Sequence, residues 1–385
     1  MPFMPIVLAG AMIILMIRRG GILLMTGVLP WFAFLLWVTL AAVNVPSSGS
    51  WLAYGYRAGS LAAIGVLLLY VSNARENITA AKVVWSSLII LTTMVVLGFL
   101  AMSFPEYRLT TIVGRVMPGA LSANDFIREM VFPALAEVQS PHGAPTPFNR
   151  PSAPFLYANS WGVMFVVLVP VAFAAVSLAR NRFLQVGVAT VVAAASVPAL
   201  ATSNRGMFVG LLASLGYVLV RLLLRGHAGR ALAGFAAAGL VGAALVWSGA
   251  LQAVLDRQLY SDSTGGRLRL YQETWRAALD RPLLGYGTPR LEESIGVAMG
   301  TQGYFWMLMF CYGFVGLVLF LVFMAGAVAR TWKVESTALL WLHSVPIGTL
   351  AIMPFYGFDT MQLTVLVLIL ALLLRESAGA IGGRR

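Results

Sequence analysis

Long apolar runs without charged residues are the feature that most constrains this chain. The runs follow one another along its 385 residues, and most are near the roughly 20 residues that cross the hydrocarbon core of a membrane. They lack the polar alternation of barrel strands, and backbone groups in lipid must be satisfied within each crossing segment. The pattern therefore predicts an all-α, polytopic membrane bundle of about eleven spans, within a range of about ten to twelve.

The predicted spans are 4–17, 21–43, 51–72, 84–103, 156–178, 183–201, 206–224, 231–250, 304–329, 337–354 and 360–374. The first run has its basic pair, Arg18 and Arg19, behind it and not ahead of it, which is unlike a signal peptide. We interpret it as a short first span, with room for a further segment before it.

Composition excludes a water-soluble fold. Hydrophobic residues make up 59% of the chain and charged residues only 10%, whereas soluble domains are about a quarter charged. A soluble fold of this size could not hide so much apolar surface from water. We therefore predict that residues 1–385 form a single transmembrane domain.

The basic residues predict the orientation. One predicted side carries 14 of the 26 basic residues but only 3 of the 14 acidic residues, and cytoplasmic loops are the ones that retain Lys and Arg. The N-terminus is then outside and the C-terminus cytoplasmic, and the long loops 104–155 and 251–303 are extracytoplasmic. Most of the +12 charge is a topology signal, so we predict no nucleic-acid partner. The basic residues of the outer side are all arginines, which suit bidentate phosphate recognition.

The first outer loop is rich in proline from Pro133 onward, which excludes a long helix there. Before it, apolar residues at helical spacing predict a short amphipathic helix over Ser122–Val138, with its N-cap at Ser122 or Asn124. An irregular segment is expected to lead from this helix into the next span.

The sequence of the second outer loop predicts a helix over Leu268–Leu279, which Pro282 ends. It also predicts a turn at Gly285 and Gly287. A second short helix is expected over Thr288–Val297. In the following span, Gly313 and Gly316 suggest close packing between helices.

Arg205 lies in the tight connection Thr202–Gly206 between two apolar runs, at the predicted outer membrane boundary. An arginine at the centre of a membrane helix costs roughly 2.5–3.5 kcal/mol on insertion scales, so such residues tend to be paired or functional. A helix-end arginine that extends its head group to water is the alternative.

Arg267 follows two glycines near the predicted start of a helix, where free N–H groups and the helix dipole favour anions. It has no evident partner, whereas Arg269 with Glu273 and Arg276 with Asp280 are spaced as i,i+4 ion pairs. Arg267 is therefore the better candidate for a diphosphate clamp.

The order of these pieces resembles the bacterial O-antigen ligase and O-antigen polymerase family over roughly residues 100–330. The matching pieces are Arg150–Asn159, Ser203–Gly206, Gly266–Ala278, Arg281–Gly287 and Tyr312–Leu317. The resemblance implies a glycosyltransferase of the bacterial cytoplasmic (inner) membrane that needs no metal or other cofactor. Its implied partners are a polyprenyl-diphosphate-linked glycan donor, a glycan or lipid acceptor whose sugar hydroxyl receives the glycan outside the cytoplasm, and membrane lipids.

The family arginines that bind the diphosphate map onto Arg205 and Arg267, which are therefore the predicted catalytic residues. Their charges would stabilise the leaving diphosphate more in the transition state than in the ground state. The predicted substrate-binding residues are Asn159, Tyr271, Trp275, Arg276, Arg290 and Gln302. Trp275 is equally interpretable as an interfacial anchor.

Gln302 is a departure from the family, whose members often carry a histidine just before the span that follows the large loop. Glutamine does not titrate near neutrality and cannot act as a general base. The base is then another residue, with Glu273, Asp262, Glu292, Glu293 and His142 as candidates, or the departing diphosphate and positioning do most of the work.

A transporter or flippase of lipid-linked glycans is the alternative function, because it also needs many spans and internal arginines. Transporters usually show internal repeats and charges at the membrane midplane. This sequence shows no repeat, and its span interiors lack acidic residues apart from Asp359 at a loop edge. A structural scaffold would not explain two outer loops rich in arginine and aromatic residues. The choice between ligase and polymerase stays open.

Overall fold

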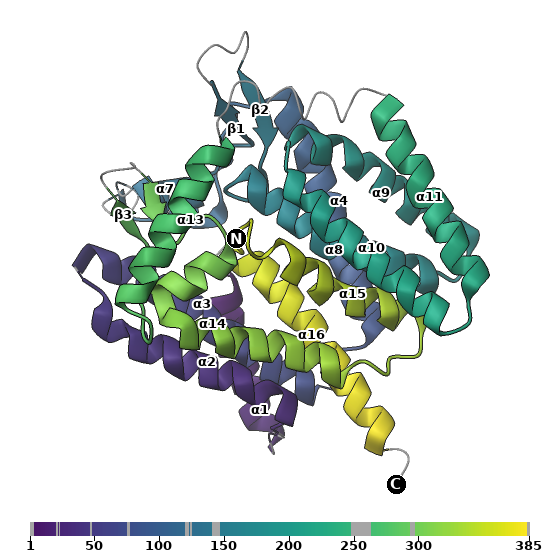
Figure 1. Cartoon of the computed structure of the whole chain (residues 1–385), viewed down its shortest axis with the longest axis horizontal. Helices are drawn as coiled ribbons and strands as arrows, with labels where there is room; N and C mark the ends of the chain where they lie inside the picture. The colour runs from purple at the N-terminus through teal and green to yellow at the C-terminus, as the bar shows by residue number, and fades with distance from the viewer. Residues whose placement is uncertain are drawn as a thin grey trace. The chain divides into compact units, whose positions relative to one another are not determined.

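The computed structural model describes residues 4–20, 22, 24–46, 48–74, 78–119, 123, 125–140, 147–247, 263–292 and 297–382. It consists of helices and two short antiparallel hairpins (Figure 1). The chain forms two compact units. Unit 1 comprises Met1–Val83, Gly265–Pro346 and Met353–Arg385, and unit 2 comprises Val84–Thr264 and Ile347–Ile352. The expectation of one transmembrane domain stays a prediction.

Each predicted span overlaps a helix in the structure, although α2 begins only at Leu29 within the predicted span 21–43. The helices are α1 (Met4–Arg19), α2 (Leu29–Leu40, continued by the 3-10 turn η2, Ala41–Asn44), α3 (Ser48–Asn73), α4 (Ala80–Ser103), α8 (Ala158–Leu178), α9 (Arg182–Ala201), α10 (Arg205–Leu224), α11 (Ala228–Trp247), α14 (Tyr304–Arg330), α15 (Thr337–Ile352) and α16 (Thr360–Gly382).

Seven helices in the described part of the chain, α3, α4, α8, α9, α10, α14 and α16, are long and apolar enough to cross a membrane. The helical class is confirmed, and the chain is a multi-pass membrane protein. The exact number of eleven spans stays a prediction.

The first outer loop differs from the prediction in its second half. A short helix α5 (Ile112–Val116) and a helix α7 (Asp125–Val131) are followed by strands β1 (Ala136–Gln139) and β2 (Phe148–Pro151). The expected helix over Ser122–Val138 is wrong beyond Val131, because Pro133 cannot continue it and the next residues pair with β2. The predicted N-caps Ser122 and Asn124 lie outside the described residues.

The second outer loop begins as predicted. Helix α13 (Ser263–Asp280) contains the expected Leu268–Leu279, and Gly285 and Gly287 have positive φ angles of 62° and 74°, as a turn requires. The helix predicted over Thr288–Val297 is wrong. Strands β3 (Arg290–Glu292) and β4 (Val297–Met299) pair there instead, and strands of three residues are too short to show a period-2 pattern in the sequence.

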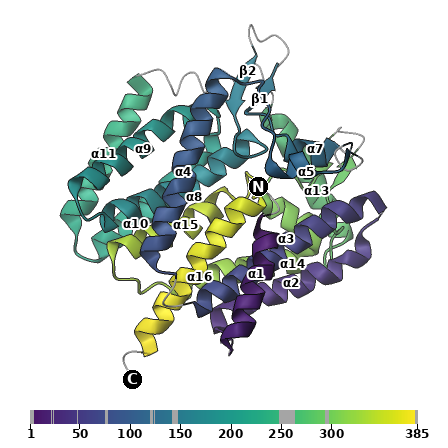
Figure 2. The ribbon, with the colours of Figure 1, turned by 180° about the vertical axis from the view of Figure 1, so that it is seen from behind.

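In unit 1, helix α14 packs along α2, while α1 and α16 pack along α3 (Figures 1 and 2). The interface between α2 and α14 is aromatic: the Trp31 ring lies 5.0 Å from Phe323 and 5.7 Å from Phe34, and the Phe34 ring lies 5.7 Å from Phe320. These four side chains are almost fully buried. Aromatic pairs at such distances add to the energy of burial.

A kink at Gly313 divides α14, because Gly313 has φ 69° and ψ −179°. The turn that follows α13 sits in this kink: the N–H of Phe314 donates to the Pro282 carbonyl (2.8 Å), and the N–H of Tyr286 donates to the Phe310 carbonyl (2.9 Å). A Cβ atom at position 313 would overlap the Leu283 carbonyl. Gly313 thus allows the backbone of α14 to contact the backbone of the turn after α13, whereas the sequence predicted close packing between helices.

In unit 2, helix α8 is buried along most of its length and packs against α9 and α10, and α10 packs against α11. Gly210 lets α8 approach α10 closely, because a Cβ there would lie 2.7 Å from Val166. Small residues at such crossings are typical of membrane helices.

Polar contacts in unit 1 join segments predicted to lie on the same membrane side. Asn44 donates to the Gly285 carbonyl (2.8 Å), and both belong to outer segments of the predicted topology. Arg375 donates to the Val71 carbonyl (3.4 Å), and both lie at predicted cytoplasmic ends. These contacts agree with the predicted alternation, while the absolute orientation stays a prediction.

We predict that Gly313→Ala lowers the free energy of unfolding by at least about 2 kcal/mol, since a side chain would add left-handed strain to a steric overlap. The matched control is Gly55→Ala in α3, where a Cβ would meet nothing within 4 Å. Thermal unfolding of both variants in detergent measures the difference. Equal melting temperatures for the two variants would contradict the role assigned to Gly313.

Candidate active site

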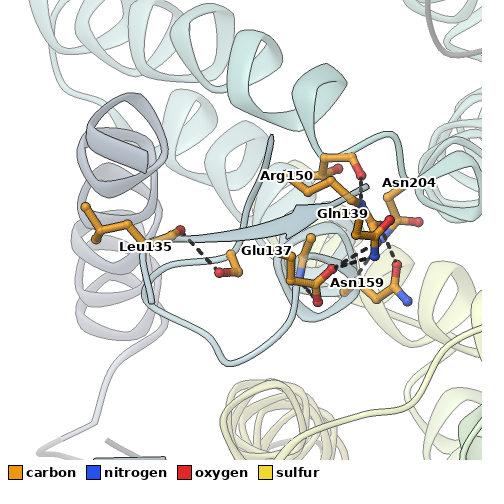
Figure 3. Close-up of polar contacts among 9 residues, drawn as sticks. Leu135, Glu137, Gln139, Arg150, Asn159 and Asn204 are labelled. Atoms are coloured by element: carbon orange, nitrogen blue, oxygen red, sulfur yellow. Dashed lines mark hydrogen bonds and ion pairs between the residues drawn. The ribbon is translucent and has the colours of Figure 1, made fainter. Parts of the chain in front are cut away.

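Arg150 is the centre of a buried polar network in unit 2 (Figure 3). It lies directly opposite Glu137 in the register of the β1–β2 hairpin, and its Nη1 donates to Glu137 Oε2 at 3.0 Å. Its Nε donates to the Thr202 carbonyl (2.8 Å), and its Nη2 donates to Asn159 Oδ1 (2.9 Å). One guanidinium group therefore joins the hairpin, the start of α8 and the end of α9.

Glu137 uses both carboxylate oxygens. Oε1 accepts a hydrogen bond from the N–H of Ala158 at 3.1 Å, and Oε2 accepts from Gln139 Nε2 at 3.4 Å in addition to Arg150. Ala158 is the first residue of α8, so the carboxylate satisfies a free N–H group and complements the positive end of the helix.

Burial makes this pair sensitive to substitution. Only 11% of the Arg150 side chain and 22% of the Glu137 side chain are exposed. A buried ion is tolerated when its partners satisfy it, and removing one partner leaves the other charge uncompensated. The network therefore fixes the hairpin and the connection between α9 and α10 in one arrangement.

The predicted residue Arg205 is the first residue of α10, and its side chain is exposed. Within the described residues it forms no salt bridge. The preceding residue, Asn204, is 2% exposed and donates from Nδ2 to the Asn159 carbonyl at 3.1 Å. Before it, Ser203 holds a positive φ of 52°, which is unusual for a residue with a side chain.

Gly162 in α8 leaves room for the Asn204 side chain, because a Cβ at position 162 would overlap the Asn204 amide group. The Asn204 Oδ1 atom is buried and accepts no hydrogen bond from the described residues. The connection between α9 and α10 thus places the exposed Arg205 next to Asn204, whose buried Oδ1 accepts no hydrogen bond from the described residues. The predicted Asn159 lies in the same network, with its carbonyl oxygens engaged by Arg150 and Asn204.

In unit 1, Arg267 is exposed and lies in the second turn of α13, since the helix begins at Ser263. One turn further, Tyr271 stacks on Trp306 with ring centres 4.6 Å apart and planes at 12°. Trp306 Nε1 donates to the Pro354 carbonyl at 3.0 Å. Burial raises the pKa of the Tyr271 hydroxyl, and the nearby charge of Arg267 opposes this rise. Arg267 thus lies one helical turn before a stacked aromatic pair and close enough for its charge to act on Tyr271.

The other predicted residues of unit 1 take separate places. Trp275 packs edge-on against the Phe314 ring, 5.5 Å away, and its side chain stays partly exposed. Arg276 pairs with Glu273 at 2.9 Å, so the expected pairs of Glu273 with Arg269 and of Arg276 with Asp280 are wrong. An i,i+3 spacing serves a helical ion pair as well as i,i+4.

Gln302 and Arg290 each have an atom without a hydrogen-bond partner among the described residues. Gln302 donates from Nε2 to the Ala298 carbonyl (3.2 Å), while its Oε1 is buried and unused. Arg290 lies over the Tyr286 ring, 4.4 Å from its centre, and its Nε is buried and unused.

The candidate bases stay predictions. Glu273 is engaged by Arg276, and Asp262, Glu293 and His142 lie outside the described residues. The backbone of Glu292 belongs to β3, and its side chain is not described.

Sequence reasoning missed the Arg150–Glu137 pair. The segment Arg150–Asn159 was matched to a family pattern, but Arg150 itself received no role. A usable signal existed: an arginine that enters an apolar span needs an acidic partner, and the same loop offers Glu137. Choosing Glu137 over the other acids of the loop requires the strand register, which the sequence did not reveal.

The chain matches a known family model over part of its length. Residues 189–321, about a third of the chain, match the family model described as O-antigen ligase. The match includes Arg205, Arg267 and the stacked pair Tyr271 and Trp306, and it confirms the resemblance to O-antigen ligases seen in the sequence. A comparison with curated proteins finds no match.

We predict that Arg150→Met lowers the free energy of unfolding by roughly 3–5 kcal/mol, because Glu137 would remain buried without its charged partner. The control is Arg276→Met, which breaks a pair of nearly equal length whose side chains are 71% and 35% exposed. An exposed pair contributes about 0–1 kcal/mol. Chemical or thermal unfolding in detergent compares the two variants, and a loss no larger for Arg150→Met would contradict the network's structural role.

Proposed function

We propose that the chain, whose residues 189–321 match the O-antigen ligase family model, is a membrane glycosyltransferase. In this proposal it transfers a glycan from a polyprenyl-diphosphate carrier to an acceptor hydroxyl, without a metal ion, on the outer face of the bacterial cytoplasmic membrane. The observation that supports it most strongly is the anchoring of Arg205. An exposed guanidinium without a salt bridge among the described residues follows a connection held by the buried network of Arg150, Asn159 and Asn204.

The anchoring matters because electrostatic catalysis depends on groups that are already in place. Arg205 begins α10, where the free N–H groups and the helix dipole add to the attraction for an anion. Because the residues before it are fixed by hydrogen bonds, its backbone needs little reorganisation when negative charge develops. An arginine held in this way suits the diphosphate of a departing carrier.

Arg267 is proposed as the second cation. It lies beside Tyr271, whose ring is held parallel to Trp306. A flat aromatic surface with a neighbouring guanidinium suits a sugar diphosphate, because sugar rings pack on aromatic faces and the guanidinium binds phosphate oxygens. Trp275, Arg276 and Gln302 are proposed to line the path of the glycan.

The proposed reaction is one displacement. The acceptor hydroxyl oxygen attacks the anomeric carbon of the donor sugar and forms the new glycosidic bond. The bond between that carbon and the diphosphate oxygen breaks, and its electron pair leaves with the polyprenyl diphosphate. The hydroxyl proton passes to a base or to the leaving diphosphate. Arg205 and Arg267 neutralise the charge that builds on the diphosphate, which lowers the barrier more than it strengthens donor binding.

We predict that Arg205→Ala and Arg267→Ala each lower the transfer rate roughly 100-fold or more, since each removes a charge that stabilises the leaving group. The assay incubates the purified chain with a lipid-diphosphate oligosaccharide and candidate acceptors and measures the new glycosidic bond. The matched control is Arg269→Ala, which removes an exposed arginine from the same helix, where it lies on a different face from Arg267.

Full transfer activity in both variants would refute the proposed roles. Movement of the lipid-linked glycan across vesicles without formation of a glycosidic bond would favour a flippase instead. Equal losses in all three variants would indicate a general effect of positive charge.

A further inference from the structure

Asn44 connects the end of η2 with the turn that follows α13 in unit 1. Its Nδ2 donates to the Gly285 carbonyl (2.8 Å), and its Oδ1 accepts from Arg281 Nη1 (3.0 Å). Its backbone carbonyl accepts a longer hydrogen bond from Arg290 Nη2 (3.5 Å). One asparagine therefore holds two arginines.

The same two arginines flank one aromatic ring. The guanidinium carbon of Arg281 lies 5.1 Å from the centre of the Tyr286 ring, and that of Arg290 lies 4.4 Å from it. Tyr286 is itself fixed, because it stacks on Phe310 with ring centres 4.7 Å apart and its N–H donates to the Phe310 carbonyl. The pair of cations thus rests on a rigid base.

Two guanidinium groups that are held close together repel each other. Neither Arg281 nor Arg290 forms a salt bridge within the described part of the chain. Burial lowers the pKa of Arg290, and the charge of Arg281 lowers it further. An anion bound by both groups would relieve this repulsion.

Most donor groups of the pair are unused. An arginine carries five N–H donors, and the described contacts engage one terminal nitrogen of each side chain with Asn44. The Nε of Arg290 is buried and unpartnered among the described residues. Two planar donor groups with free N–H bonds match the tetrahedral oxygens of a phosphate better than a single carboxylate.

From this geometry we infer that Arg281, Arg290, Asn44 and Tyr286 form a second binding site, for a phosphate-type oxyanion. It is separate from the proposed site at Arg267, since α13 alone extends about 20 Å from that residue to its end at a rise of about 1.5 Å per residue. The phosphate could belong to a phospholipid head group or to a soluble molecule. The inference does not depend on transfer activity.

The test measures binding to the full chain in an Arg205→Ala, Arg267→Ala background, so that the proposed diphosphate arginines contribute nothing. One arm titrates inorganic phosphate against chloride at equal ionic strength and follows thermal stabilisation in detergent. The other arm uses native mass spectrometry to compare phosphatidylglycerol with phosphatidylcholine. Arg281→Gln and Arg290→Gln are introduced separately, and Arg269→Gln is the matched control for loss of one exposed charge in the same unit.

We expect at least one phosphate source to bind, and both glutamine variants to weaken it about tenfold or more, as the loss of charge-assisted hydrogen bonds implies. Arg269→Gln should bind like its parent. Binding of phosphatidylglycerol alone would identify a head group as the source, and binding of inorganic phosphate as well would identify a site for free phosphate groups.

Absence of binding from both sources, or an equal loss in Arg269→Gln, would overturn the inference. Should Arg290→Gln fail to fold, Arg290→Lys retains the charge and removes the planar donor group. Weaker binding by Arg290→Lys would support the inference, and unchanged affinity would refute it.

Discussion

Backbone groups of the segments that connect apolar helices can pair with water outside the membrane, but those buried away from water must find partners within the protein. Both units of this chain satisfy that constraint with a polar side chain that joins distant segments. In unit 2, Arg150 links the hairpin to the start of α8 and to the end of α9. In unit 1, Asn44 links the end of η2 to the turn after α13. These contacts hold Arg281 and Arg290 in unit 1 and fix the residues before Arg205 in unit 2.

Glycine makes the same arrangements sterically feasible at three positions. Gly313 and Gly285 let the turn after α13 enter the kink of α14, where any Cβ would overlap a backbone atom. Gly162 leaves the volume that Asn204 occupies beside α8. The glycines therefore permit the close approach of the segments, and the hydrogen-bonded polar side chains stabilise it.

The helices were predictable because length and hydropathy carry their signal over about 20 residues. The expected spans 156–178 and 206–224 agree closely with α8 (Ala158–Leu178) and α10 (Arg205–Leu224). The hairpins were not predictable, because strands of three or four residues show no usable period and their pairing depends on residues far along the chain.

The candidate site was predictable only in its exposed cations. Arg205 and Arg267 could be selected by their position at connections, glycines and a family resemblance, and their catalytic roles stay proposals. The polar contacts around the candidate sites could not be selected from the sequence. Glu137 lies opposite Arg150 because of the strand register, and Asn44 bonds to Arg281 although 237 positions of sequence separate them. Such contacts depend on tertiary structure, so local pattern in the sequence cannot specify them.

The proposed function requires that Arg205, at the start of α10, and Arg267, on α13, both lie outside the cytoplasm. Labelling of single cysteines in intact cells tests this most directly, in a Cys311→Ala background because Cys311 is the chain's one cysteine and is buried. Arg205→Cys and Arg267→Cys should react with a membrane-impermeant maleimide, while His227→Cys, on the predicted cytoplasmic side, should react only after permeabilisation. Labelling of position 205 or 267 only after permeabilisation would contradict the account.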